Sequence, residues 1–306
     1  MYLSLSRSAM YPSLLIEYQW GPRHLGKIFC ELFAQLKAER LEAKHTGQKV
    51  KNMFLKIVLN SPTGKMQQEV SWMYDPFNVF KIRINGQLIL LLLVDRLLDL
   101  GCEIIQCNTD GVVYRAKKGL KQAISDAIKE VEALTRLEFE SDEYEAFYQY
   151  AINDYFGVLK DGEIEEKGMF ITKNKLGKGL APVVIPKAVI NYFVKGEPVE
   201  EFIKSDGDIR DFLMSQQVDK KFEVWHAENQ VQRINRFYAS TDGAYLFKYD
   251  PSSGRDKENM LTKSGVTILN QLYDTTVEGR KINYRYYISE AKKIISDFTE
   301  QQLELF

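Results

Sequence analysis

The stretch Cys102-Glu-Ile-Ile-Gln-Cys107-Asn-Thr-Asp-Gly111-Val-Val-Tyr114 decides how this sequence is interpreted. Two short runs of strand-forming residues flank Asn108-Thr-Asp-Gly111, and Asn, Asp and Gly are residues that tight turns prefer. The stretch therefore predicts a β-hairpin with Asp110 at its tip. A carboxylate on a rigid tip can face a divalent cation across a cleft, because Mg²⁺ prefers oxygen ligands.

Helices are predicted upstream of this hairpin. Apolar residues recur near helical spacing over 25–44, and a second helix is predicted over 49–61. His45-Thr-Gly47 separates the two, so we expect an antiparallel helical pair. Residues 1–20 are interpreted as a short strand and turn, and 62–80 as irregular. A third helix is predicted over 84–100, with Gly101 as its C-terminal cap.

The rest of the chain mixes helical and strand patterns. A helix is predicted over 120–134, followed by strand-like segments at 137–140, 147–158 and 163–171. The Pro-, Gly- and Lys-rich stretch 172–182 is interpreted as a domain boundary. Further helices are predicted over 186–195, 198–204, 208–215 and 286–304, with a strand-like stretch at 232–249. This mixture indicates the α+β class.

Composition excludes several classes of protein. The chain has 306 residues, 45% of them hydrophobic and 27% charged, which is ordinary for a soluble globular protein. Its three cysteines form no CxxC pair, so we expect a reducing cytoplasm. The apolar run 88–94 is too short to cross a bilayer and is expected to lie in a buried helix, with no membrane association. The net charge is −1, yet residues 23–65 are locally basic and 130–145 acidic. From charge alone, such runs indicate solvated helix faces.

Three segments carry a resemblance to a known family. They are Ser6-Arg-Ser-Ala-Met-Tyr-Pro-Ser-Leu14, Lys56-Ile-Val-Leu-Asn-Ser-Pro-Thr-Gly64 and Asn108-Thr-Asp-Gly111. In this order they resemble motifs A, B and C of the family B DNA-directed DNA polymerases, as found in viruses and phages. Those motifs read Asp-x-x-Ser-Leu-Tyr-Pro-Ser-Ile, Lys-x-x-x-Asn-Ser-x-Tyr-Gly and Asp-Thr-Asp-Ser.

The resemblance implies a right-hand polymerase of the α+β class. It would have an antiparallel palm sheet, helical-hairpin fingers and a mixed α/β thumb. The implied domains are 1–20 (palm), 21–66 (fingers), 67–171 (palm with the motif C hairpin) and 172–306 (thumb). The implied reaction adds dNTPs to a primer 3′-end on a template, with two Mg²⁺ ions stabilising the attacking and leaving oxygens. Primer–template DNA and dNTPs are the implied partners, and the host cytoplasm the implied location.

The resemblance also assigns roles to individual residues. Asp110 would be the catalytic metal ligand, with Asn108 in place of the first motif C aspartate. Tyr11 would pack under the incoming deoxyribose, and the backbone near Ala9 and Met10 would face the triphosphate. The implied phosphate contacts are Arg40, Lys44, Lys56 and Asn60. The implied DNA contacts are Gly64, Tyr155, Lys173 and Lys175.

Departures from the motifs keep other interpretations open. Ser6 stands where motif A has an aspartate, so the two-metal site is incomplete as written. No exonuclease region precedes motif A. A gene fragment, a split gene with a separately encoded exonuclease-bearing half, or a misplaced start would each explain both features. One alternative function is a non-catalytic DNA-binding remnant or subunit of a polymerase. The other is an α+β interaction protein whose motif matches are coincidental.

Overall fold

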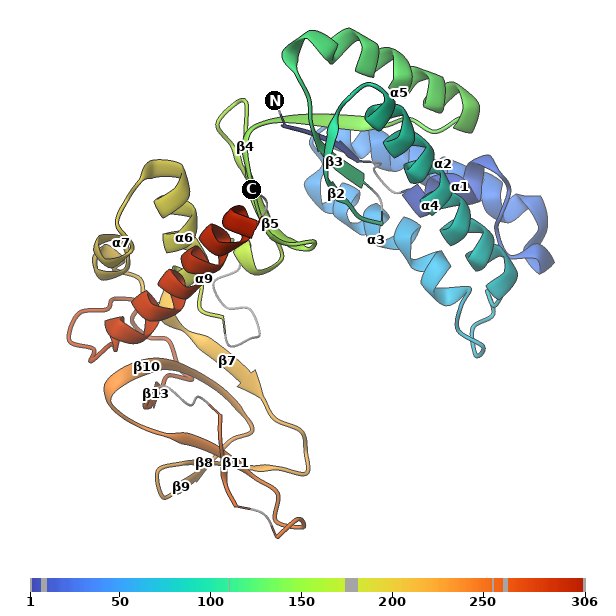
Figure 1. The fold of residues 1–306 in the computed structure, drawn as a ribbon. Coiled ribbons are helices and arrows are strands. Elements are labelled where there is room, and N and C mark those ends of the chain that lie inside the picture. Colours follow the sequence, from blue (N-terminus) through green and yellow to red (C-terminus); the bar gives the residue numbers. More distant parts are fainter. Residues whose placement is uncertain are drawn as a thin grey trace. The chain divides into compact units, whose positions relative to one another are not determined.

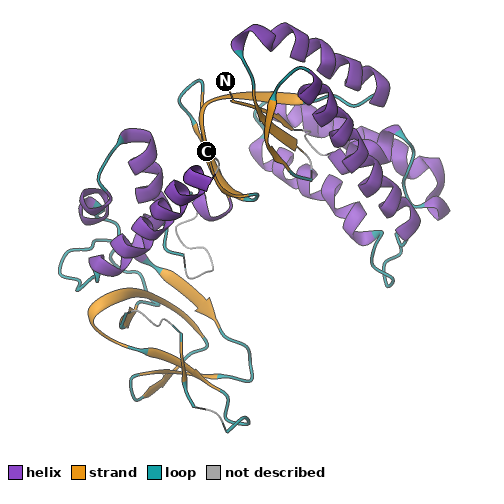
Figure 2. Ribbon diagram, viewed as in Figure 1, coloured by secondary structure: helices purple, strands orange, loops and turns teal. Residues whose placement is uncertain are grey.

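The computed structural model describes residues 2–6, 10–109, 111–173, 181–254, 256–260 and 264–304. It is a mixed α/β structure with antiparallel sheets, in agreement with the predicted α+β class (Figures 1 and 2). The chain divides into two compact units. Unit 1 comprises 1–146 and 159–161, and unit 2 comprises 147–158 and 162–306. The finer boundaries at residues 20, 66 and 171 stay predictions.

The sheet of unit 1 is built around its N-terminal strand. β1 (Tyr2–Ser6) pairs antiparallel with β3 (Gly111–Arg115) on one side and with β4 (Glu140–Ala151) on the other. β2 (Glu103–Cys107) pairs with the free side of β3, which confirms the predicted β2–β3 hairpin. Leu3, Val112 and Tyr114 are buried in the core of this unit. Because side chains alternate along a strand, one face of the sheet is thereby fixed against the helices.

Five α-helices complete unit 1 in the described residues: α1 (Met10–Glu17), α2 (Gly26–His45), α3 (Lys49–Lys65), α4 (Pro76–Asp99) and α5 (Lys121–Thr135). Short 3₁₀ turns at Arg23–Leu25 and Lys118–Leu120 precede α2 and α5. The helices α2 and α3 pack against each other as the predicted pair. Leu14 and Leu15 of α1 are fully buried, so α1 anchors the chain directly after β1.

The prediction of an irregular stretch over 62–80 is wrong at both ends. α3 continues to Lys65, and α4 begins at Pro76 instead of residue 84. Asp75 is the N-cap, because its carboxylate accepts from the backbone N–H of Asn78 at 3.3 Å and Pro76 follows at the first helical position. Arg23 donates to the same carboxylate from its backbone N and its Nε, each at 2.9 Å. Asp75 therefore fixes the start of α4 to the segment before α2.

α4 is long and apolar enough to cross a membrane by length and composition. It is also a core helix, because Ile82, Leu93 and Leu97 are fully buried in unit 1. Its other side leaves large apolar side chains more than half exposed, namely Phe77, Phe80, Ile84, Leu88, Leu91 and Leu98. The expected buried helix is thus present, but only one of its faces is buried.

Unit 2 contains a helical layer and two small sheets (Figure 1). After the end of β4 come β5 (Asp154–Leu159), β6 (Ile164–Lys167) and a 3₁₀ turn (Gly168–Phe170). The helices are α6 (Val184–Lys195), α7 (Val199–Ser205), α8 (Ile209–Phe212) and α9 (Tyr284–Glu304). Their core includes Phe156, Phe170, Phe212, Phe237 and Tyr287.

One sheet of unit 2 has the order β13-β10-β7 and the other β12-β11-β8-β9. The strand bounds are β7 (Met214–Gln217), β8 (Glu223–His226), β9 (Asn229–Val231), β10 (Ile234–Ala244), β11 (Leu246–Tyr249), β12 (Glu258–Asn259) and β13 (Val266–Ile268). All pairings within both sheets are antiparallel.

Several predicted strand bounds are wrong. The segments 137–140 and 147–158 are replaced by β4 over 140–151 and β5 from 154, because Ile152-Asn153 forms a turn inside the second segment. Only 164–167 of the segment 163–171 is a strand. The predicted helix 208–215 ends at Phe212, and β7 starts at Met214 by pairing with β10. The stretch 232–249 is two strands, interrupted at Tyr245.

Candidate active site

β1 brings two of the three motif segments side by side. Ser6 is the Cα partner of Gly111 on β3 and, on its other side, of Glu140 on β4. The β2–β3 connection is closed by the backbone N–H of Asn108, which donates to the carbonyl of Gly111 at 3.0 Å. Asp110, the expected catalytic and metal-binding residue, lies outside the described residues. Ser6 thus pairs with the residue that directly follows Asp110 in the sequence.

Tyr11 and Met10 follow from the start of α1. Met10 is buried and Tyr11 half-buried, while Ala9 lies outside the described residues. Both side chains lie over Gly86 of α4. A Cβ at Gly86 would stand 3.5 Å from Leu14 Cδ1, 3.6 Å from Tyr11 Cε1 and 3.7 Å from Met10 Cε. The Tyr11 ring thus has a fixed support, and its contact with a deoxyribose stays a prediction.

Arg40 holds the helical pair together. Its side chain is buried, and its Nε donates to Asn52 Oδ1 on α3 at 3.2 Å. Residues 52, 56 and 60 are four apart and share one face of α3. Lys56 and Asn60 are exposed on that face, one and two turns beyond Asn52. Arg40 is therefore engaged within the protein, whereas the Lys56 side chain makes no ion pair with the part of the chain that the structure describes.

Lys44 and Gly64 lie at the ends of the helical pair. Lys44 Nζ is 3.4 Å from Glu140 Oε1, in an ion pair whose two side chains are both about half exposed. Gly64 is exposed near the end of α3, with open space where a Cβ would be. Lys44 thus links helix α2 to the strand position beside Ser6. The phosphate role of Lys44 and the DNA contact of Gly64 stay predictions.

The remaining expected DNA contacts belong to unit 2. Tyr155 of β5 is buried, with its ring centroid 5.0 Å from that of Phe147. Lys173 is exposed after the 3₁₀ turn, and Lys175 lies outside the described residues. Burial gives Tyr155 a packing role in unit 2, and its expected contact with a primer strand stays a prediction.

Basic neighbours pair with three of the seven acidic residues in the stretch 130–145. Glu143 receives hydrogen bonds from Lys121 and Lys160, and these hold the pKa of its carboxyl below its usual value. Arg96 Nη2 is 2.9 Å from Glu130 Oε1. With Lys44 beside Glu140, three acidic residues of this stretch are paired with cations. Cations thus neutralise part of this stretch, whereas Glu138, Asp142 and Glu145 are exposed.

The residues at positions 6 and 108 do not fit the two-cation site that the motifs imply. Position 6 offers a hydroxyl and position 108 an amide, and a bridging ligand between two Mg²⁺ ions requires a carboxylate. Within the described ranges, the structure contains no group of three or more His, Cys, Asp or Glu residues placed to hold a metal ion.

Glu140 is a residue of this site that the sequence interpretation missed. The sequence pattern puts it at the end of a short predicted strand and within an acidic stretch. Its position beside Ser6 depends on the pairing of two strands more than 130 residues apart in the chain. The only signal in the sequence is its position in a predicted strand, which does not specify a partner strand.

A comparison with solved structures finds similar chains, and one of them is a polymerase. The solved structure of the family B DNA polymerase from the hyperthermophilic archaeon Pyrobaculum calidifontis matches with a TM-score of 0.48 and 16% sequence identity. The match covers 97% of this chain and 44% of that chain. The chain thus spans less than half the length of that polymerase. No family model matches the sequence, and no curated protein matches it.

Proposed function

We propose that this chain provides the nucleotidyl-transfer part of a template-directed DNA polymerase of family B. The observation that carries the proposal is the pairing of Ser6 with Gly111. Motif-like segments about 100 residues apart in the chain are neighbours in one sheet, where side chains from two adjacent strands could hold the same pair of cations. A coincidental match of short motifs gives no reason for this pairing.

In this proposal the palm, fingers and thumb of a right-hand polymerase are distributed over the two units. The sheet β2-β3-β1-β4 with α1, α4 and α5 acts as the palm, and the pair α2–α3 as the fingers. The segment 172–306 acts as the thumb. Lys56 and Asn60 would contact the triphosphate of an incoming dNTP from α3, because a cation there neutralises charge that grows on the leaving pyrophosphate. Arg40 would act indirectly, by holding α3 through Asn52.

The chain by itself is expected to bind primer–template DNA but to extend the primer slowly. Mg²⁺, when bound, supplies charge stabilisation at the attacking and leaving oxygens. With serine at position 6, a bridging carboxylate is missing, and each 1.4 kcal/mol or so of lost stabilisation lowers the rate about tenfold. We expect a rate reduced about a thousandfold relative to a complete site. An exonuclease-bearing half encoded separately would be a partner in the cell.

Primer extension with Mg²⁺ tests this function, with Ser6→Asp compared to the parent chain. Ser4→Asp is the matched control, because it adds the same charge to the same strand opposite Val113 and Asp142. We expect extension to rise at least tenfold in Ser6→Asp and to stay at the parent level in Ser4→Asp. Equal activity of all three proteins, with robust extension by the parent, would show that position 6 is not a metal-ligand position.

The alternative is a non-catalytic DNA-binding subunit. The donor set at positions 6 and 108 favours it, because neither side chain is acidic. Tight, salt-sensitive binding to primer–template DNA without extension, in the parent and in Ser6→Asp alike, would support this alternative. Absence of DNA binding in both proteins would exclude both functions.

A further inference from the structure

The sheet β12-β11-β8-β9 of unit 2 has one buried and one solvent-facing side. Val224 of β8 and Leu246 of β11 are buried in the core of this unit. Residues directly opposite each other on neighbouring strands share a face. Trp225 pairs with Phe247, and Glu223 with Tyr249, so these four positions lie on the face opposite to the buried side chains. The outward face of the two central strands is therefore mainly aromatic.

These aromatic rings are not part of either hydrophobic core. Trp225, Phe247 and Tyr249 are partly exposed, and Tyr245 is 47% exposed. The ring centroids of Tyr245 and Phe247 are 6.3 Å apart. Polar residues flank the rings on the outer strands, because Gln230 of β9 pairs with Trp225 and Asn259 of β12 with Phe247. A row of aromatic side chains bordered by amides is typical of surfaces that stack bases.

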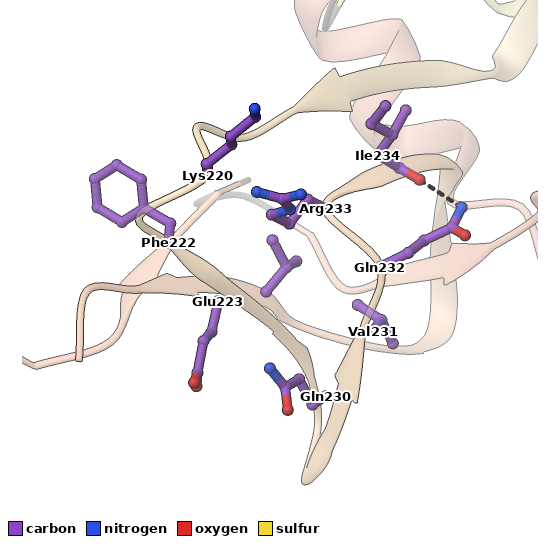
Figure 3. Close-up of a pocket in the computed structure, with 9 residues that line it drawn as sticks. Lys220, Phe222, Glu223, Gln230, Val231, Gln232, Arg233 and Ile234 are labelled. Carbon is purple, nitrogen blue, oxygen red and sulfur yellow. Dashed lines mark hydrogen bonds between the residues drawn. The ribbon is translucent and has the colours of Figure 1, made fainter.

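One cation lies over this face, and two others lie at the β9 edge on the other side of the sheet. Lys257 Nζ lies 4.1 Å from the centroid of the Trp225 indole. At the β9 edge an open pocket of about 780 Å³ is lined by nine residues, including Lys220 and Arg233 (Figure 3). In Figure 3 these two side chains lie on one side of β8, and the Glu223 carboxylate extends from the other. Neither Lys220 nor Arg233 has an ion-pair partner among the residues that the structure describes.

We propose that this sheet is a binding site for single-stranded DNA. Bases stack on Trp225 and Phe247, and the strand then passes around the β9 edge to the other side of β8, where Lys220 and Arg233 attract its phosphates. Stacking suits this face because every base presents a π-surface, so no sequence preference is needed. Cations without carboxylate partners provide the charge complementarity that a phosphate backbone requires. Lys257 shields the indole in the free protein and moves to a phosphate when a base replaces it.

The inference extends the proposed polymerase function by giving unit 2 a contact with unpaired template, but its chemistry is independent of nucleotidyl transfer. Binding of fluorescein-labelled oligo(dT) of 20 nucleotides by the full chain, followed by anisotropy, is the direct test. Oligo(rU) of the same length shows whether the sugar matters. A blunt DNA hairpin without unpaired bases measures duplex binding separately. If the full chain binds the duplex hairpin but not oligo(dT), this inference is wrong and the proposed function still stands.

Variants locate the site. Alanine at Trp225 or Phe247 is expected to weaken oligo(dT) binding at least about fivefold, and Trp225→Phe to restore most of it. The matched control is Tyr273→Ala, because Tyr273 is an exposed aromatic residue of unit 2 that belongs to neither sheet. Equal affinity of Trp225→Ala and the parent, with both proteins folded by circular dichroism, would contradict the stacking role.

The edge cations have a separate signature. For single strands the logarithm of the binding constant falls with that of salt concentration by about 0.7 per neutralised phosphate. Replacing Lys220 and Arg233 together by alanine should therefore reduce this slope by about 1.4. An unchanged slope would show that Lys220 and Arg233 do not contact the phosphates. A concentration-dependent dimer that Trp225→Ala abolishes would instead assign the aromatic face to a second copy of this chain.

Discussion

Ser6 of β1 and Glu140 of β4 face each other as Cα partners across an antiparallel pairing. An aspartate introduced at position 6 would therefore stand directly opposite an existing carboxylate. Like charges at such positions are unfavourable by about 0.2–1 kcal/mol. Lys44, which lies 3.4 Å from Glu140, would compensate only in part because this ion pair is exposed.

This relationship predicts how a restored motif A should behave. Ser6→Asp with Glu140→Gln should be more stable than Ser6→Asp alone, by up to about 1 kcal/mol in urea unfolding. If the proposed function holds, the double variant should also extend primers faster, because its new carboxylate no longer repels Glu140. Glu140→Gln by itself is the control and should change extension little. A double variant less active than Ser6→Asp would indicate that Glu140 takes part in cation binding.

Lys56 and Lys51 provide a matched pair on α3. Lys56 is exposed on the face shared with Asn52 and Asn60, whereas Lys51 Nζ lies 3.4 Å from Glu39 Oε2. We expect Lys56→Ala to weaken dATP binding at least fivefold in the Ser6→Asp background, because a charge-assisted phosphate contact is lost. Lys51→Ala should leave binding within twofold. Equilibrium dialysis or fluorescence titration of a labelled nucleotide gives both values, and equal losses would reject the assignment of Lys56.

Arg40 is predicted to act on stability. Its buried side chain donates to Asn52 on α3, so Arg40→Ala should lower the free energy of unfolding by about 1–3 kcal/mol. Lys44→Ala should lower it by less than about 1 kcal/mol. A double-mutant cycle with Asn52→Ala should show a coupling of about 0.5 kcal/mol or more. A stable Arg40→Ala variant with impaired nucleotide binding would favour a direct phosphate contact.

Asp206 in unit 2 gives a pH prediction. Burial raises the pKa of its carboxyl to about 6, helped by the neighbouring Asp211, while the backbone N–H of Asp208 and Lys187 act in the opposite direction. The folded state therefore binds a proton between about pH 4 and 6 that the unfolded state releases. Stability from this group is present below pH 4 and is lost as pH rises to 6, by at most about 1.4 kcal/mol per pH unit.

Asp206→Asn should remove that dependence. Urea unfolding at pH 4, 5, 6 and 7 is expected to show a flatter profile for the variant, and Asp256→Asn, at an exposed carboxyl, should follow the parent. The Lys187–Asp211 ion pair and the Tyr284 hydroxyl are the other ionisable groups at this position. A parent whose stability rises steadily from pH 4 to 6, by more than Asp206→Asn does, would contradict the assignment.

Local patterns in the sequence predicted the elements that local interactions form. The helices α2, α3 and α5 and the β2–β3 hairpin follow from apolar spacing and turn residues. The start of α4 could have been found from Asp75-Pro76, an N-cap followed by proline. The apolar residues of α4 occupy two faces, of which only one is buried. Apolar spacing alone therefore does not mark where this helix begins.

The rest depends on contacts between distant residues. β7 has the residues of a short helix extension but becomes a strand because β10 pairs with it. The strands β8, β9, β12 and β13 are two to four residues long, and such runs carry little periodic signal. The neighbours of Ser6 follow from strand register, which no local pattern specifies. The motif order therefore suggested the function, while the structure added Glu140 and the engagement of Arg40.

The division of the chain has a consequence for protein engineering. The sequence leaves unit 1 after Ala146, returns at Leu159 and leaves again after Asp161, so three peptide connections join the two units. A single proteolytic nick or a single splice point cannot release either one. Chimaeras that exchange the C-terminal part at residue 172 would keep residues 147–158, whose Phe156 belongs to the core of unit 2. A chimaera that keeps both hydrophobic cores intact must exchange residues 147–158 together with the chain from Gly162 onward.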